Sequence, residues 1–193
     1  MPSPLSHGTL ALAFGSLFPR SLLPRKLWLV GVCCAALPDV DILSFRLGIP
    51  YQHMLGHRGL THSISFALLL ALVVAGFTMF SERGRRRAWP FGLYLFACTL
   101  SHGLLDAITK GGYGVAFFAP FLSRRYLFPW RVIEAAPLSV KQFLSTRGLH
   151  IVGVELMWVV LPCLLITLLA CTVWAMLDQS TAEGPEPRSV CQG

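Results

Sequence analysis

The fold is decided by the stretch His57-Arg58-Gly59-Leu60-Thr61-His62-Ser63, which stands directly before an uncharged apolar run over residues 63–80. A run of about 18 such residues is the shortest that is read as membrane-spanning. The two histidines therefore lie at a membrane boundary. Ionisable side chains at membrane depth are costly and by default mark functional sites. The stretch thus predicts a polar site at the end of a membrane helix.

Three further polar groups flank apolar segments in the same way. His7 precedes residues 10–18, Asp39 and Asp41 follow residues 27–38, and His102 and Asp106 end residues 89–105. When the apolar segments cross a bilayer alternately, all of these groups fall near one face, together with His150 and Glu155. We therefore predict that they converge on one metal site.

The composition indicates an integral membrane protein. The chain has 193 residues, about one domain, of which 54% are hydrophobic and 13% charged. Soluble domains carry roughly twice that fraction of charge. The predicted fold class is therefore all-α, a multi-pass helical membrane bundle of about four to five helices with a polar site at one membrane face.

The apolar segments predict five helices within a single domain, residues 1–178. Ser6 and Thr61 are the expected N-caps of the first and third helices, and Pro162 is expected to kink the last. Residues 179–193 are expected to form a disordered tail. The expected helix bounds are residues 7–18, 27–38, 61–80, 89–108 and 149–177.

Residues 110–148 form the longest predicted loop and are rich in Gly, Pro, Phe and Arg. Loops of this length are usually functional or disordered, and the aromatic content argues against disorder. We expect an interfacial segment that acts as a lid or binds substrate.

The net charge of +7 is explained by membrane topology. The densest cluster, residues 83–87, lacks the interleaved aromatics of a nucleic-acid site, so no nucleic-acid partner is expected and membrane lipid is. Basic residues 20–26 and 83–87 would be cytoplasmic, which places the polar site on the outer face of the membrane. The loop at residues 110–148 is basic too, so this orientation rests on the density of residues 83–87.

The polar groups have the composition of a divalent-metal site. His102 and Asp106 are spaced i, i+4 and share one helical face. Imidazole with several carboxylates suits Zn²⁺, Mn²⁺ or Fe²⁺, and no Cys-x-x-Cys pair offers a thiolate site. Two bridged ions about 3.5 to 4 Å apart can activate water and clamp the oxygens of a phosphoryl displacement. The alternatives are an interhelical hydrogen bond for His102 and solvated helix-end carboxylates for Asp39 and Asp41.

Two residues beside these groups have open roles. Arg58 either snorkels to the interface or binds a phosphate. Glu155 lies inside an apolar helix and needs a partner. His150 and Glu155 are about 140° apart around a helix, so they do not converge on one ion from that helix.

The order of the motifs resembles a known family. Ser6-His7, Leu37-Pro38-Asp39-Val40-Asp41, the stretch from His57 to Ser63, and Ser101-His102-Gly103-Leu104-Leu105-Asp106 resemble the LexA-regulated, membrane-bound metal-dependent hydrolases of bacterial inner membranes, over roughly residues 6–160. That family is distantly similar to zinc-dependent phospholipase C, which implies more than one zinc ion. The resemblance implies as ligands His7, Asp39, His57, His62, His102 and Asp106, with Asp41 and Glu155 as additions. The soluble enzymes have a late His-x-x-x-Glu pair, and His150 to Glu155 is one residue longer.

The sequence therefore predicts a membrane-embedded metal-dependent hydrolase that acts on a small-molecule or lipid phosphoester, such as a phospholipid or lipid-linked phosphate, through a metal-activated water. Asp41, Arg58 and Glu155 are the predicted catalytic residues. The alternative is a non-catalytic membrane protein, either a metal transporter or a scaffold with a structural metal. A transport pathway would need polar residues through the bilayer, and the middle of residues 63–80 has none.

Overall fold

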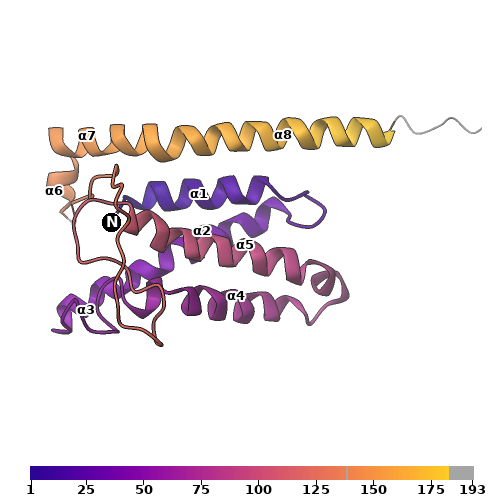
Figure 1. Cartoon of the computed structure of the whole chain (residues 1–193). Helices are drawn as coiled ribbons and strands as arrows, with labels where there is room; N and C mark the ends of the chain where they lie inside the picture. The colour runs from indigo at the N-terminus through magenta and orange to yellow at the C-terminus, as the bar shows by residue number, and fades with distance from the viewer. Residues whose placement is uncertain (138, 183–193) are drawn as a thin grey trace, which may run out of the picture.

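The computed structural model describes residues 1–137 and 139–182, which form an all-helical bundle (Figure 1). Four helices run side by side: α1 (Pro4–Ser16), α2 (Trp28–Ala36), α4 (Ile64–Thr78) and α5 (Glu82–Ala107). A long helical rod, α7 (Thr146–Glu155) followed by α8 (Leu161–Ala182), packs along α1. Over the described residues there are two isolated β-bridges and no strand, so the predicted fold class is confirmed.

Short helical pieces join the long helices. They are the 3₁₀ turns η1 (Arg25–Leu27), η2 (Leu37–Ile42) and η3 (Leu60–His62), the short helices α3 (Leu43–Arg46) and α6 (Val140–Phe143), and a π-helical turn η4 (Leu156–Val160). Two of them, η2 and η3, carry the polar motifs and contact each other. The polar residues are therefore held on tight turns at the ends of helices.

Helices α4 and α5 make the most extensive contact between long helices, through small residues. Ala67, Ala71 and Ala75 recur every four residues on one face of α4, and all three are buried. A Cβ on Gly92 would lie 3.3 Å from the Cβ of Ala75, so the two backbones approach closely. Small residues allow such close packing in membranes, where no hydrophobic force drives helices together.

Helix α5 is also held against α2 by a buried aromatic residue. Tyr94 is fully buried, and its hydroxyl donates a hydrogen bond of 3.0 Å to the carbonyl oxygen of Trp28. A Cβ on Gly31 would lie 2.1 Å from that hydroxyl, so a side chain at position 31 would displace the ring. The contact fixes how α5 sits against α2, and α5 carries two of the polar site residues.

Two stretches are long and apolar enough to cross a membrane, Arg25–Arg46 and Thr146–Ser180. Helix α4 is equally apolar but shorter. Large apolar side chains point outward from these elements, including Leu72 and Phe77 on α4 and Leu168 on α8. Exposed apolar surface of this extent is characteristic of a surface that faces lipid.

The two ends of the bundle differ in content. The N-terminus, α3, α6 and the long segment after α5 gather at one end (Figure 1). The turn between α4 and α5 and the segment after α1 lie at the other. The Arg-rich residues 83–87 therefore lie far from the motif residues, which meet at the first end.

Several predicted helix starts differ from the observed ones. Helix α1 begins at Pro4 with Ser3 as its N-cap, rather than after Ser6, because proline suits the first turn of a helix. Helix α4 is capped by Ser63, whose hydroxyl accepts from the Phe66 N–H at 3.0 Å, and not by Thr61. The hydroxyl of Thr61 is bonded to a site carboxylate instead.

Helix α5 begins at Glu82, seven residues before the predicted start. Its N-cap is Ser81, whose hydroxyl accepts from the Gly84 N–H at 3.0 Å, and Pro90 lies inside the helix. The basic residues therefore form the first turns of the helix and not a loop. Hydropathy alone did not predict these first turns, because their residues are charged.

The last predicted helix is longer than expected and starts earlier. The predicted loop 110–148 contains α6 and the first residues of α7. Before Pro162, the predicted site of a kink, the helix passes through the π-helical turn η4, and α8 then continues to Ala182, beyond the predicted end at 177. Residues 179–182 are thus helical, and the remainder of the predicted tail, 183–193, lies outside the described residues.

Candidate metal centre

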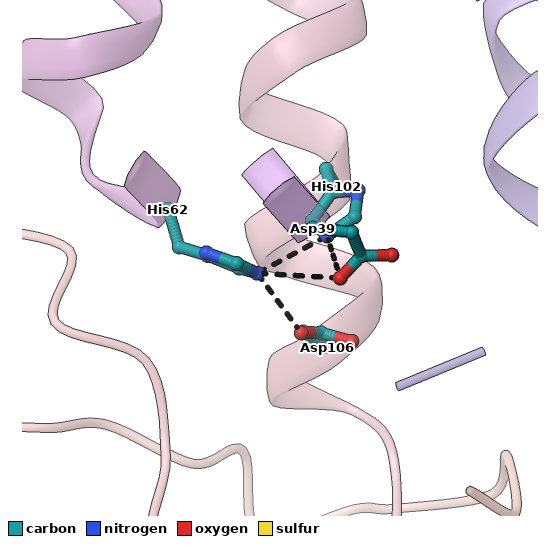
Figure 2. A group of neighbouring side chains, drawn as sticks. All are labelled: Asp39, His62, His102 and Asp106. Atoms are coloured by element: carbon teal, nitrogen blue, oxygen red, sulfur yellow. Dashed lines mark hydrogen bonds and ion pairs between the residues drawn. The ribbon is translucent and has the colours of Figure 1, made fainter. Parts of the chain in front are cut away.

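Four side chains from three elements meet at the polar end of the bundle (Figure 2). Asp39 comes from η2, His62 from η3, and His102 and Asp106 from successive turns of α5. One ligand atom from each lies within 4.8 Å of all the others. Distant segments of the chain are thus brought to one point, as the order of the motifs predicts.

The donor atoms have separations that suit one cation. The Nε2 of His102 lies 3.1 Å from the Nε2 of His62 and 3.3 Å from an Asp39 oxygen. The Nε2 of His62 lies 3.2 Å from an Asp106 oxygen and 4.0 Å from the Asp39 oxygen. Ligand atoms of a tetrahedral zinc site, at ordinary bond lengths, are about 3.3 Å apart. The group therefore has approximately the dimensions of a zinc coordination shell.

Hydrogen bonds aim both histidines at the centre of this group. The Nδ1 of His102 lies 2.7 Å from the carbonyl oxygen of Ala35, to which it donates. The Nδ1 of His62 lies 3.1 Å from an oxygen of Asp41. Each ring is left with its Nε2 facing the other donors. Metal-binding histidines almost always have such a partner on the opposite nitrogen.

Asp41 joins the residues of the His57–Ser63 stretch. One of its oxygens lies 2.6 Å from the Nδ1 of His57. The other accepts from the Arg58 N–H at 3.0 Å and from the Thr61 hydroxyl at 2.6 Å, and it also faces His62. A carboxylate offers about four acceptor positions, so these contacts use its capacity. Asp41 is therefore placed to orient the surrounding residues.

His57 lies in a second group and not in the first. Ligand atoms of Asp41, His57 and His62 lie within 4.8 Å of one another, which by distance alone would suit another ion. The short contact between His57 and Asp41 is, however, that of a hydrogen bond, which uses Nδ1 and leaves Nε2. The structure thus separates His57 from the predicted shared site with His102 and Asp106.

His7 lies beside the four-residue group without joining it. Its ring stacks on the ring of His102, with centroids 3.8 Å apart and planes 14° apart. Both ring nitrogens of His7 are buried and have no hydrogen-bond partner. An unpaired buried polar atom is costly, and no protein group satisfies the donor nitrogen or the acceptor nitrogen of this ring.

Arg58 is buried and does not snorkel. The residue is 2% exposed, and its Nε lies 2.9 Å from an oxygen of Asp106. A terminal nitrogen donates to the carbonyl oxygen of Gly111 at 3.2 Å. Its backbone has φ of 61°, in the left-handed region that is uncommon for residues other than glycine. Arg58 therefore acts first as the counter-charge of Asp106.

Glu155 is placed apart from the group, and its partner is the start of α1. The carboxylate accepts from the Ser3 N–H at 2.6 Å, from the Ser3 hydroxyl, and from the Ser6 hydroxyl at 2.8 Å. These contacts satisfy donors at the helix N-terminus, where negative charge is favourable. His150 is exposed and lies 3.8 Å from Glu134. The residues of the late pair thus point to different surroundings.

The group carries charges that also pair without a metal. Burial acts to lower the pKa of His62, but the nearby carboxylates of Asp106 and Asp41 outweigh it and raise that pKa to about 9. A protonated His62 and Arg58 would then balance two of the carboxylates. A cation at Nε2 would have to displace this proton, because only neutral imidazole binds metal.

Buried carboxylate oxygens remain that this ion-pair network does not satisfy. One oxygen of Asp106 (Oδ1) and one oxygen of Asp39 (Oδ1) are buried without a hydrogen-bond donor, whereas the other Asp106 oxygen faces Arg58 and His62. His62, His102 and Asp106 are also buried, whereas the Asp39 side chain keeps 16% of its exposure. Asp39 therefore marks the side from which an ion or a small molecule would reach the group.

Arg125 is a structural residue of the site that the sequence analysis missed. Its guanidinium stacks 4.8 Å above the ring of Tyr51. It donates to five backbone carbonyl oxygens at 2.6 to 3.2 Å, those of Tyr51, His53, His57, Arg58 and Gly114. It thus ties the loop after α5 to the polar motif. The only sequence signal was an arginine within an aromatic-rich loop.

The comparisons with known proteins give a family. A family model described as YdjM inner membrane protein matches residues 1–180. The chain belongs to this family. It is also 38% identical, over 168 residues, to the inner membrane protein YbcI of Escherichia coli (strain K12), covering 86% of this chain and 95% of YbcI. No solved structure matches.

Membership of the YdjM family supports the predicted inner-membrane location. The names of the family and of YbcI give a location and no reaction. The resemblance to LexA-regulated hydrolases and to phospholipase C therefore stays a prediction, as does the side of the membrane on which the site lies.

Proposed function

We propose that this YdjM-family protein is a metal-dependent hydrolase of the inner membrane that acts on a phosphoester, such as a phospholipid or a lipid-linked phosphate. One observation carries the proposal: donor atoms of Asp39, His62, His102 and Asp106 meet within 4.8 Å in a buried group. Three elements separated in sequence, η2, η3 and α5, bring these donors together. Ion-pair networks alone do not require such a set of donors.

The residues present fit a divalent cation, most simply Zn²⁺, with Mn²⁺ or Fe²⁺ as alternatives. The donor set is two imidazoles and two carboxylates, with one partnered nitrogen on each ring. The buried oxygens of Asp39 and Asp106 without a donor are explained by an ion. A second ion would find candidate donors in Asp41, His57 and His62, and His7 stacks on His102 with both ring nitrogens unpaired.

A bound cation would supply Lewis-acid chemistry and lower the pKa of water. The chain would supply the rest. Asp41 holds the Nδ1 of His57 at 2.6 Å, so the free Nε2 of His57 is the group that would exchange a proton with water or a leaving group. Arg58, fixed by Asp106, would add positive charge beside a phosphate.

In this proposal Asp41 and Glu155 are positioning residues rather than groups that touch substrate. Asp41 is fully engaged by the residues from His57 to His62, and Glu155 by Ser3 and Ser6. Each keeps an element of the site in place. This refines the catalytic roles that the sequence suggested for these two carboxylates.

The place of the group at one end of the bundle supports a lipid substrate and an outward-facing site. The group lies at the end of a bundle whose lateral surface is apolar, which is the depth of lipid headgroups in a multi-pass arrangement. The opposite end carries residues 83–87, whose density of charge favours the cytoplasm and so supports a site at the periplasmic face.

A structural metal site in a scaffold is the second candidate, because structural zinc sites have four protein ligands whereas catalytic sites keep an open position. Here four protein donors meet, and three of those residues are buried. A metal transporter is less well supported, since α4 carries no ionisable residue that could continue a pathway.

The test is metal analysis of the purified protein coupled to a screen of phosphoesters. Wild type should contain bound metal, and His102→Ala and Asp106→Ala should lose it. His150→Ala is the matched control at the same end and should keep it. His57→Ala should keep the metal and lose turnover. Circular dichroism checks that each variant is folded.

Each result bears on a different part of the proposal. Equal metal content in wild type, His102→Ala and Asp106→Ala would remove the ligand assignment. Bound metal with no turnover on any phosphoester would favour the structural site. Loss of metal in His57→Ala would move that residue from proton transfer to ligation.

A further inference from the structure

A second polar feature lies at the opposite end of the bundle, where η1 meets the turn between α4 and α5. It is a cavity of about 390 Å³. Its lining combines cationic and apolar, mostly aromatic, side chains, chiefly those of Lys26, Leu27, Phe77, Phe80, Arg87 and Phe91. The cavity shares no residue with the candidate metal centre, so its role is independent of the proposed hydrolysis.

Two cations reach this cavity from separate parts of the chain. Lys26 comes from η1 and Arg87 from the second turn of α5. The Nε of Arg87 donates to the carbonyl oxygen of Ser21 at 3.1 Å. This bond fixes the guanidinium and leaves its two terminal nitrogens to donate to a ligand. Among the lining residues there is no carboxylate. The cavity therefore favours an anion.

The remaining walls are apolar and open toward the lipid side. Phe91 is 2% exposed and forms the inner wall, whereas Phe77 and Phe80 are 70% and 90% exposed. A free inorganic anion would gain nothing from these rings. A ligand with a charged head and a hydrocarbon chain would match both parts of the surface.

The start of α5 adds to the positive potential. Ser81 and Gly84 line the cavity, and the N-terminus of this 26-residue helix carries a partial positive charge. Arg85 and Arg86 lie on the neighbouring turn and are exposed. Basic pockets between membrane helices on the cytoplasmic side bind anionic lipid headgroups.

We propose that this cavity binds one anionic phospholipid of the surrounding bilayer. Its phosphate would lie between Lys26 and Arg87, and its acyl chain would run along Phe77 and Phe80. A lipid there would fasten η1 to the turn between α4 and α5. The inner-membrane location supplies such a ligand from the bilayer itself.

The test is lipid retention by the purified full chain, measured by native mass spectrometry after incubation with nanodiscs. Nanodiscs of phosphatidylcholine with phosphatidylglycerol supply a neutral and an anionic lipid together. Wild type should retain one phosphatidylglycerol in preference to phosphatidylcholine. Lys26→Gln with Arg87→Gln should lower that preference about thirtyfold, since each basic residue near a membrane surface is worth roughly fivefold in binding.

Two controls keep the result specific to the cavity. Arg85→Gln removes a charge from the same helix end outside the lining and should leave retention within about twofold, because its exposed position offers only screened attraction. Lys26→Arg keeps the charge and should bind as wild type does. Circular dichroism serves as the check that the double variant is folded.

Three outcomes would overturn the proposal. One is equal retention by wild type and the Lys26→Gln, Arg87→Gln double variant. Another is equal retention of phosphatidylcholine and phosphatidylglycerol. The third is displacement of the lipid by millimolar inorganic phosphate, which would show a simple anion site in which Phe77 and Phe80 have no part.

Discussion

The two ends of the bundle both concentrate charge, but they handle it in opposite ways. At the metal-centre end, Asp106, Arg58 and His62 are buried and paired with one another. At the basic end, Arg85 and Arg86 are exposed to the surroundings. Buried charges require fixed partners, whereas exposed charges need none. The difference separates a buried polar group, whose charges are paired, from an exposed basic surface.

Helix α5 carries residues of both ends. Helix α5 has 26 residues, begins in the Arg-rich segment and ends with His102 and Asp106. At 1.5 Å per residue such a helix is about 39 Å long, which exceeds the thickness of the hydrocarbon core. One rigid element therefore sets the distance between the basic end and the candidate metal centre. Substitutions at the two ends of α5 provide a direct comparison.

The largest effect is expected at Asp106. Asp106→Asn keeps the shape but removes the charge that faces Arg58 at 2.9 Å and His62 at 3.2 Å. A buried arginine without its partner costs about 3 kcal/mol or more in free energy of unfolding. We expect a lower midpoint of thermal unfolding in detergent and loss of bound metal. Unchanged stability would mean that Arg58 finds another partner. The short distances from Asp106 to Arg58 and His62 would then not contribute to the free energy of unfolding.

The second largest loss of stability is expected at Arg125. Arg125→Lys keeps the charge but loses the planar fork that donates to five carbonyl oxygens. We expect a loss of about 2 kcal/mol in free energy of unfolding, from several hydrogen bonds at about 1 kcal/mol each with partial replacement by lysine. Limited proteolysis should cut the segment after α5 faster than in wild type.

Arg124→Lys is the matched control for this prediction. The Arg124 guanidinium lies 5.5 Å from the ring of Tyr126 in a cation–π contact. Lysine supports the same kind of contact, so the rate of proteolysis should barely change. Equal sensitivity of the two variants would show that general charge, and not the fork of Arg125, holds the loop.

The third largest effect is expected at Glu155. In Glu155→Gln one acceptor oxygen becomes an amide nitrogen, which weakens the contacts to Ser3 and Ser6 by about 1 kcal/mol. If Glu155 only positions α1, thermal stability falls while metal content stays at the wild-type level. A loss of metal at unchanged stability would instead place Glu155 among the ligands. Glu134→Gln, at a partly exposed carboxylate near His150, is the control.

The fold was largely readable from the sequence because lipid imposes a simple rule. Apolar runs must be helical in a membrane, so the existence of the long helices followed from composition alone. Their bounds did not. The start of α5 lies in a charged segment and is fixed by Ser81 as the N-cap rather than by hydropathy. The π-helical turn before Pro162 likewise depends on local packing.

The predicted ligand set contains the four residues that meet, but also His7 and His57, which lie beside that group, and the sequence did not give the roles of these residues. The i, i+4 spacing of His102 and Asp106 placed both on one buried face of α5, and the order of the motifs brought Asp39 to them. Which nitrogen of His57 is occupied depends on the path of a turn with a positive φ at Arg58. Arg125 could not be recognised, because an arginine in a loop has the same sequence signature whether it is solvated or bonded to five carbonyl groups.

The smallest effect is expected at the basic end. Arg85 is 61% exposed on its side chain and lies 3.9 Å from the highly exposed Glu82. Such surface pairs contribute between about 0 and 1 kcal/mol, and salt screens them. Arg85→Gln should therefore leave the unfolding midpoint and the metal content unchanged, and raising the salt concentration should not separate the variant from wild type. A destabilisation approaching that of Asp106→Asn would mean that charge at both ends supports the bundle, and the contrast between the ends would then be one of location alone.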